Sequence, residues 1–167
     1  MLDMRSRFSR SWQNAPRAVS TKSAIQAACL ASLVLAAIAA LGLGQGVFHL
    51  ASSLGSTVIV AYVFPDSPFA RLRSIVGGHI VASLIGLVTA ALFGESPFAA
   101  ALAVGVSIVA MHLLRVMQPP AGGDPILIVL DGQPFASFVA VATGSVLIAL
   151  FVPMWRRHAR KDREGLR

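Results

Sequence analysis

The sequence predicts an all-α protein, a polytopic helical bundle that forms one domain within a membrane. Composition is the first observation, because 56% of the 167 residues are hydrophobic and only 13% are charged, whereas about a quarter are charged in soluble domains. Distribution is the second, since the segments 23–65, 74–94, 96–114 and 132–155 contain no Asp, Glu, Lys or Arg. A span needs roughly 20 mostly apolar residues, so these segments have room for about five crossings.

Basic residues flank the apolar part of the chain, and they account for much of the net charge of +7. We expect a basic leader at 1–22, a membrane domain at 23–155 and a basic tail at 156–167. Such clusters indicate topology and lipid contact rather than nucleic acid, so the expected partner is the lipid bilayer. The leader is either an interfacial helix or unstructured. A cleavable signal peptide is not expected, because the apolar segment that follows the leader is longer than a typical signal core.

The order of apolar segments predicts four spans with two short segments between them. The short segment 47–64 begins with small and hydroxyl residues, whereas the short segment 119–131 is interrupted by prolines and glycines, which disfavour regular helix. As a helix the latter would reach only about 20 Å, against a hydrocarbon core of about 30 Å. Both are therefore predicted to be broken half-helices. The four spans are expected at 23–43, 75–93, 97–115 and 135–154.

The arginines distinguish two topologies. If all six segments cross from a cytoplasmic N-terminus, every Lys and Arg falls on the cytoplasmic side, and Glu95 and Asp131 lie opposite. If the short segments re-enter instead, four spans remain and Arg71, Arg73 and Arg115 become external. The positive-inside rule favours six crossings, with both termini cytoplasmic and the chain in a bacterial inner membrane.

The two halves of the chain share one plan: a span, a broken half-helix, a turn and a span. Residues 53–60 correspond to 120–127, and three crossings per half make the second half inverted relative to the first. Interrupted segments at matching positions of an inverted repeat indicate a transport site near the midplane. The predicted substrate-binding residues are Ser53, Gly55, Ser56, Thr57, His79, Gln118, Pro119, Pro120, Ala121, Gly122, Gly123 and Asp124.

These residue types suit a small anion. Helix N-termini near Ser56 and Asp124 would present N–H groups, glycines would let the backbone approach, and hydroxyls would add donors. Alternatively, the glycines only permit tight helix crossing and the hydroxyls bond the backbone. Asp124 is either an N-cap or a buried carboxylate that carries a proton with the anion or binds a cation. His79 is a gate, proton carrier or ligand, or else a hydrogen-bonded packing residue.

Four short stretches also carry a family resemblance, and they read ASSLGS at 51–56, PDSP at 65–68, VGGH at 76–79 and QPPAG at 118–122. With these stretches the chain resembles the HPP family of integral membrane proteins over most of residues 25–152. The resemblance implies a bundle usually described with four membrane helices, and nitrite transport as in some photosynthetic members. Gln118 stands where the motif of the family has its first histidine.

We therefore expect a transporter or channel for a small inorganic anion such as nitrite, coupled to protons and working without a cofactor. No phosphate loop, zinc signature or nucleophile–base pair is evident, and His49, His79 and His112 lack metal-ligand spacing, so neither an enzyme nor a metal site is expected. Small residues at spacing four favour a homo-oligomer. Two other classes stay open: a membrane enzyme using His79 and Asp124, and a non-transporting scaffold subunit.

Overall fold

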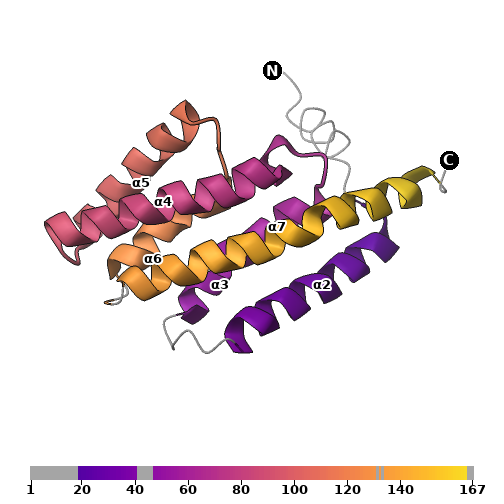
Figure 1. Ribbon diagram of the computed structural model, residues 1–167, viewed down its shortest axis with the longest axis horizontal. Helices are drawn as coiled ribbons and strands as arrows, with labels where there is room; N and C mark the ends of the chain where they lie inside the picture. Colours follow the sequence, from indigo (N-terminus) through magenta and orange to yellow (C-terminus); the bar gives the residue numbers. More distant parts are fainter. Residues whose placement is uncertain (1–18, 41–46, 131, 133, 165–167) are drawn as a thin grey trace, which may run out of the picture.

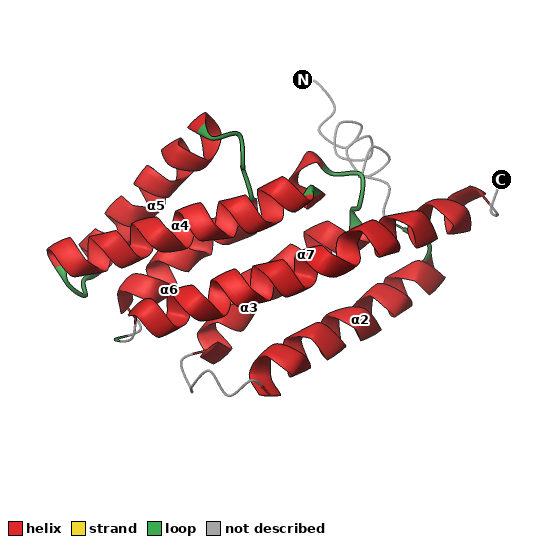
Figure 2. Ribbon diagram, viewed as in Figure 1, coloured by secondary structure: helices red, strands yellow, loops and turns green. Residues whose placement is uncertain are grey.

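The computed structural model describes residues 19–40, 47–130, 132 and 134–164, and every regular element in these ranges is a helix (Figures 1 and 2). The all-α expectation is confirmed for this part of the chain, and most of the basic leader lies outside it. The α-helices are α2 (Thr21–Ala40), α3 (Val47–Val58), α4 (Leu72–Phe93), α5 (Pro97–Leu113), α6 (Asp124–Leu130) and α7 (Pro134–Glu164). Shorter elements are a π-helical turn, η1 (Ile59–Val63), and 3₁₀ turns η2 (Pro68–Ala70) and η3 (Pro119–Gly123).

Local sequence explains where α4 and α5 end and begin. Gly94 follows α4 with a φ of 69°, a conformation that favours glycine. Ser96 then caps α5, since its Oγ accepts a hydrogen bond from the Ala99 amide at 3.1 Å, and Pro97 occupies the first turn, where no N–H is needed. The predicted turn at 94–97 is therefore built as expected.

The side-chain distribution is that of a bundle in lipid. By length and composition two helices can cross a membrane, Leu72–Phe93 and Pro134–Asp162, and three apolar helices are shorter: Thr21–Ala37, Ser52–Val63 and Pro97–Leu113. Large apolar side chains are exposed at every fourth position of α4, namely Ile80, Leu84, Val88 and Leu92. Polar side chains are instead buried inside the bundle. This arrangement suits an apolar solvent outside, because lipid does not penalise exposed apolar side chains.

Basic residues gather at one end of the bundle. A guanidinium nitrogen of Arg156 donates to the carbonyl oxygen of Ala70 at 2.8 Å, and the Arg73 guanidinium donates to the carbonyl oxygen of Arg115. The loop after η2, the turn after α5 and the end of α7 therefore lie together. Figure 1 shows the C-terminal end of α7 and the start of α2 on this same side.

The C-terminal tail is a continuation of α7, which runs through Pro153 to Glu164. Its Asp162 carboxylate accepts hydrogen bonds from the hydroxyls of Ser20 and Ser23, the latter at 2.7 Å. The tail is thus attached to the start of α2 at the basic end.

The turn that contains Glu95, between α4 and α5, lies at the end of the bundle opposite to the basic residues. A Cβ built on Gly132 would lie 3.6 Å from a carboxylate oxygen of Glu95, so the turns before α5 and before α7 are neighbours. The six segments therefore alternate in direction between the two ends (Figure 1). Alternating direction is what six crossings and an inverted plan require, although η3 with α6 is too short to span as regular helix.

One of the two predicted breaks is wrong. Residues 53–57 lie inside α3, which begins at Val47 and continues into η1. The hydroxyl of Ser56 donates to the carbonyl oxygen four residues earlier at 2.9 Å, and that of Thr57 lies within hydrogen-bonding distance of the corresponding oxygen, at 3.0 Å. The single Gly55 costs a helix only about 1 kcal/mol. The break in the second half is present, since only a 3₁₀ turn and extended chain connect α5 to α6.

The irregular turn of the first half is η1, where Ile59–Val63 forms π-helix. Tyr62 is fully buried there, and its hydroxyl donates to the carbonyl oxygen of Ile148 at 3.0 Å. The indole nitrogen of Trp155 donates to the carbonyl oxygen of Tyr62 at 2.6 Å, and the two rings meet edge to face. These contacts fix η1 against α7.

A face of small residues on α4 holds the broken segment. Gly78, Ala82 and Gly86 follow one another at spacing four, and Ala82 is fully buried. A Cβ on Gly78 would overlap the Gln118 side chain, and a Cβ on Gly86 would lie 2.9 Å from the Cα of Pro125. The stretch that contains η3 and α6 can therefore lie directly on α4 because these positions lack larger side chains.

We expect Gly78→Ala to destabilise the protein by about 1–3 kcal/mol, as overpacking does in other cores. The added methyl group would overlap Gln118 and lie 2.9 Å from the carbonyl oxygen of Val116. The matched control is Gly105→Ala on α5, where a Cβ meets no atom within 4 Å. Thermal unfolding in detergent measures the difference, and equal midpoints for the two variants would refute the packing argument.

Candidate functional site

The Asp124 carboxylate is the centre of the buried polar site. It is fully buried, although it is the first residue of α6. Its Oδ1 accepts a hydrogen bond from Ser53 Oγ of α3 at 2.6 Å, and its Oδ2 lies 2.7 Å from His79 Nδ1 and 3.3 Å from Ser83 Oγ, both on α4. Three helices therefore converge on one carboxylate. These bonds join Asp124 to other helices, whereas an N-cap would bond to backbone N–H groups of its own helix.

His79 joins this carboxylate to Thr57. Its imidazole is fully buried, with Nδ1 facing Asp124 and Nε2 lying 2.7 Å from Thr57 Oγ1. His79 and Ser83 are four residues apart on α4, so both face Asp124, and Ser53 and Thr57 have the same spacing on α3. The helical spacing of four explains why each helix contributes two polar groups.

Counting protons shows that the centre has more than one arrangement. Thr57 has one hydroxyl hydrogen and two acceptors within reach, His79 Nε2 and the Ser53 carbonyl oxygen at 3.0 Å. If the hydrogen goes to Nε2, neutral His79 donates from Nδ1 to an ionised Asp124, and the pair holds one proton. If the hydrogen goes to Ser53, Nε2 must donate, and the pair holds two protons. Rotation of one hydroxyl therefore suffices for the pair to accept a proton.

Gln118 leaves one hydrogen-bonding atom unused. The side chain is fully buried, and its Nε2 donates to Thr57 Oγ1 at 3.4 Å. Its Oε1 is buried and, among the described residues, has no hydrogen-bond partner. An unsatisfied buried acceptor costs about 1–3 kcal/mol. This oxygen therefore marks a position where a ligand or water with a donor would be stabilised.

The structure brings together several of the residues that the sequence predicts. Ser53, Thr57, His79, Gln118 and Asp124 form the polar centre. The carbonyl oxygen of Pro120 also belongs to it, since Ser53 Oγ lies 2.9 Å away. Ser53 has a single hydroxyl hydrogen, so it can donate either to the Pro120 carbonyl oxygen or to Asp124. If Asp124 is protonated, it can donate to Ser53 Oγ while Ser53 donates to Pro120.

Other predicted residues lie outside the centre. Ser56 is exposed and donates to Ser52, Pro119 is exposed, and Ala121 is buried in an apolar cluster with Ala82 and Met111. Because α3 begins at Val47, no helix N-terminus lies near Ser56, and the expected cage of two opposed N-termini does not form.

The predicted glycines have a different role from tight crossing. A Cβ built on Gly55, Gly122 or Gly123 meets no atom within 4 Å. These three glycines therefore border open space, while Gly78 and Gly86 provide the close helix approach. Gly122 and Gly123 are partly buried and lie between Gln118 and Asp124 along the chain.

Ser83 is a member of the centre that sequence reasoning missed. Its signal was its spacing of four from His79, next to the small-residue face of α4. The described residues hold no cluster of three or more His, Cys, Asp or Glu side chains suited to a metal. The donor set is one imidazole, one carboxylate, hydroxyls and an amide, which suits proton handling and small polar ligands.

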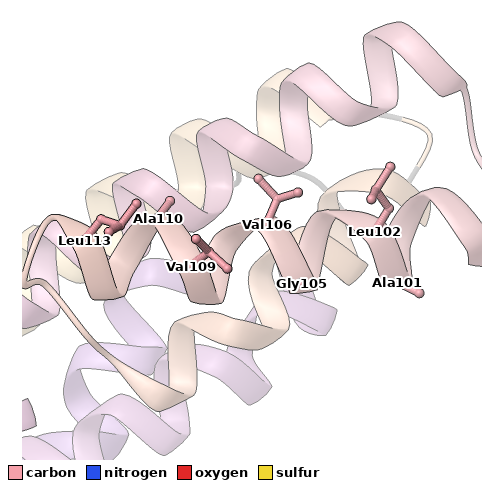
Figure 3. A pocket seen from close by; sticks show the side chains of 7 residues that line it. All are labelled: Ala101, Leu102, Gly105, Val106, Val109, Ala110 and Leu113. Carbon is pink, nitrogen blue, oxygen red and sulfur yellow. The ribbon is translucent and has the colours of Figure 1, made fainter.

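The outer face of α5 is a separate surface feature. A groove runs along this helix, and Figure 3 shows the side chains that line it, all of which are apolar. No polar group of the centre contributes to it. The groove is lined by Ala101, Leu102, Gly105, Val106, Val109, Ala110 and Leu113.

The bundle and its buried ionisable pair define a polytopic helical membrane protein. The chain matches the family described as "HPP, transmembrane region" over residues 14–164, so it belongs to the HPP family. A transmembrane protein of Dictyostelium discoideum is 33% identical over 126 residues, which cover 70% of this chain and 40% of the relative. A second from the same organism is 26% identical over 121 residues, covering 67% and 42%.

The chain thus spans about two fifths of the length of these curated relatives. No solved structure matches it. The family confirms the membrane setting that composition predicts, and the resemblance read from the four short motifs is correct.

We expect a double-mutant cycle to show strong coupling between His79 and Asp124. His79→Ala leaves a buried carboxylate without its imidazole, which costs about 3–5 kcal/mol. Adding Asp124→Asn removes that charge, so the double variant should lose less than the sum of the single losses, by about 1–3 kcal/mol. Thermal unfolding of the four proteins in detergent measures this, and strict additivity would contradict the proton-sharing geometry.

Proposed function

We propose that this chain is a membrane transporter or channel for a small inorganic anion, and that a proton crosses with the anion. Nitrite is the candidate substrate that the HPP resemblance suggests. The observation that carries the proposal is the His79–Asp124 pair, two fully buried ionisable side chains 2.7 Å apart inside a membrane bundle. Burying ionisable residues inside a membrane is energetically unfavourable, and such residues commonly mark ion pathways and proton relays.

Charge explains why the proton and the anion would move together. With one proton the pair carries one negative charge, and two unit charges about 4 Å apart repel by about 4 kcal/mol at an effective dielectric constant of about 20. A second proton makes the pair neutral and removes this repulsion. Protonation of the pair and entry of an anion therefore favour each other.

The open positions at Gly122 and Gly123 suggest where the substrate approaches. Both glycines belong to η3 together with Pro120, whose carbonyl oxygen belongs to the polar centre, and a Cβ on either would meet no atom within 4 Å. Glycine at these positions leaves that space free. The substrate site therefore lies beside η3, next to Gln118 and Asp124.

Orientation and assembly complete the proposal. The positive-inside rule favours a cytoplasmic position for the basic end of the bundle, with both termini there. We include in the proposal that the membrane is a bacterial inner membrane. The α5 groove offers a small-residue face at Ala101 and Gly105 for a homo-oligomer.

We expect uptake of nitrite into proteoliposomes to be driven by an acidic exterior. Asp124→Asn should weaken the dependence on the pH gradient, because Asn keeps the shape of the side chain but lacks the negative charge that excludes an anion without a proton. The matched control is Ser107→Ala, since Ser107 is also fully buried but donates only to Ala103 in its own helix. Unchanged pH dependence in Asp124→Asn would remove Asp124 from the proton step.

The position of the pathway is tested by filling its open space. We expect Gly122→Leu to lower flux at least about tenfold, with little loss of stability, because a Cβ at this position meets no atom within 4 Å and the longer side chain would fill the space beside the centre. Ala91→Leu is the control, as Ala91 is an exposed small residue of α4 that belongs neither to the polar centre nor to the α5 groove. Full flux in Gly122→Leu would show that this space is not the pathway.

One observation favours an enzyme as the second candidate. Thr57, His79 and Asp124 stand in the order hydroxyl, imidazole and carboxylate, with Thr57 Oγ1 at Nε2 and Asp124 at Nδ1, both at 2.7 Å. Acyl-transfer enzymes use this order to activate a hydroxyl nucleophile. Thr57 is fully buried, however, which favours proton transfer over attack on a substrate.

A fluorophosphonate probe separates the two candidates, because it reacts with hydroxyls that an adjacent imidazole activates. We expect no labelling of the protein in liposomes, as the probe cannot reach Thr57. Labelling that is lost in Thr57→Val but kept in Ser56→Ala, whose exposed hydroxyl serves as control, would favour the enzyme.

A further inference from the structure

We propose that the polar centre binds its small acid in the neutral, protonated form, so that weak acids are accepted and anions of strong acids are rejected. This inference rests on the proposed transport function and adds a selectivity rule to it. It follows from which atom of the centre is left free and from the charges that surround that atom.

The free atom is an acceptor. Within the described part of the chain, Gln118 Oε1 is buried without a partner, while one N–H of the amide nitrogen Nε2 donates to Thr57 Oγ1. A ligand that satisfies this oxygen must bring a hydrogen-bond donor. The O–H of a neutral acid is such a donor, and a bare anion has none. The amide oxygen therefore prefers the protonated form of the ligand.

No fixed positive charge compensates an anion at this position. The apolar parts of the helices around the centre, residues 47–65, 74–94, 97–114 and 134–155, contain no Lys or Arg. Proteins that hold bare anions usually use the charge-assisted donors of Arg or Lys. Here the nearest ionisable groups are His79 and Asp124, whose net charge is negative or zero.

The remaining neighbours of the pair are neutral. The side chains that hydrogen-bond to it are Ser53 and Thr57 of α3 and Ser83 of α4. Histidines elsewhere on the packed helices are His49 in the first turn of α3, His112 in the last turn of α5 and His158 near the C-terminal end of α7. Asp124 is therefore the group that disfavours a second negative charge in the centre.

The rule divides common small anions into two groups. Nitrite and formate are conjugate bases of weak acids, and a fraction of each carries an O–H near neutral pH. Nitrate and chloride derive from strong acids and bring no donor. Transport should therefore follow the concentration of the neutral acid, which rises about tenfold for each unit that the pH falls above the pKa of the ligand.

The test is counterflow of labelled nitrite, formate, nitrate and chloride in proteoliposomes held at equal pH on both sides. Protein-free liposomes provide the correction for passive leakage of the neutral acids. We expect exchange of nitrite and formate without net current, faster at lower pH, and neither exchange nor competition by nitrate or chloride. Gln118→Met should lower exchange at least about tenfold, whereas Ser107→Ala should retain it.

A second variant tests the role of the charge. Asp124→Asn removes the negative charge, so nitrate exchange should appear in this variant although the wild-type protein excludes it. Nitrate or chloride exchange in the wild type at rates similar to nitrite, or a net current carried by the anion, would overturn the inference and leave the transport proposal standing. Absence of exchange for all four ligands would instead contradict transport itself.

Discussion

The structure depends on the burial of one carboxylate. Removing a carboxylate from water costs several kcal/mol unless donors replace the lost hydration, and Asp124 receives donors from both α3 and α4. This requirement fixes the rotation of each helix, because Ser53 must face the same point as His79. It also fixes the distance, since α6 can approach α4 only where Gly78, Ala82 and Gly86 lack bulk. The glycine face and the polar centre are two consequences of one constraint.

The same carboxylate explains why the chain tolerates a break in this region. Extended and 3₁₀ backbone at 116–123 gives up regular helix, which is acceptable in a membrane only where protein surrounds it. Here α3, α4 and α5 surround the break. The irregular backbone lets Gln118 and Asp124 both point into the interior from one short stretch. A continuous helix of this length would not direct both side chains to the same place. The irregular backbone is thus part of how the polar groups are positioned.

Composition and the residues that terminate helices predicted much of the fold, but they did not predict which helices pack against each other. Apolar runs bounded by Gly94 and Pro97 predicted α4 and α5 closely, because termination is a local property. The first break was mispredicted, since hydroxyl residues can satisfy themselves within a helix, as Thr57 does. His79 and Asp124 were each identifiable as unusual, but their contact, and the participation of Ser83, depend on which faces meet across three helices. The periodicity of a sequence identifies one face of a helix, but it does not identify the helix that packs against that face.

The π-helical turn η1 has a consequence for the geometry of the first half. A π-turn accommodates one more residue than an α-turn, which displaces everything beyond it by about 100° around the helix axis. Upstream of η1, Ser53 and Thr57 face the carboxylate; within it, Tyr62 faces α7 and bonds Ile148. One helix therefore serves two partners on different sides. If one residue were deleted from η1, the helix could place either the hydroxyls of Ser53 and Thr57 or the ring of Tyr62 correctly, but not both.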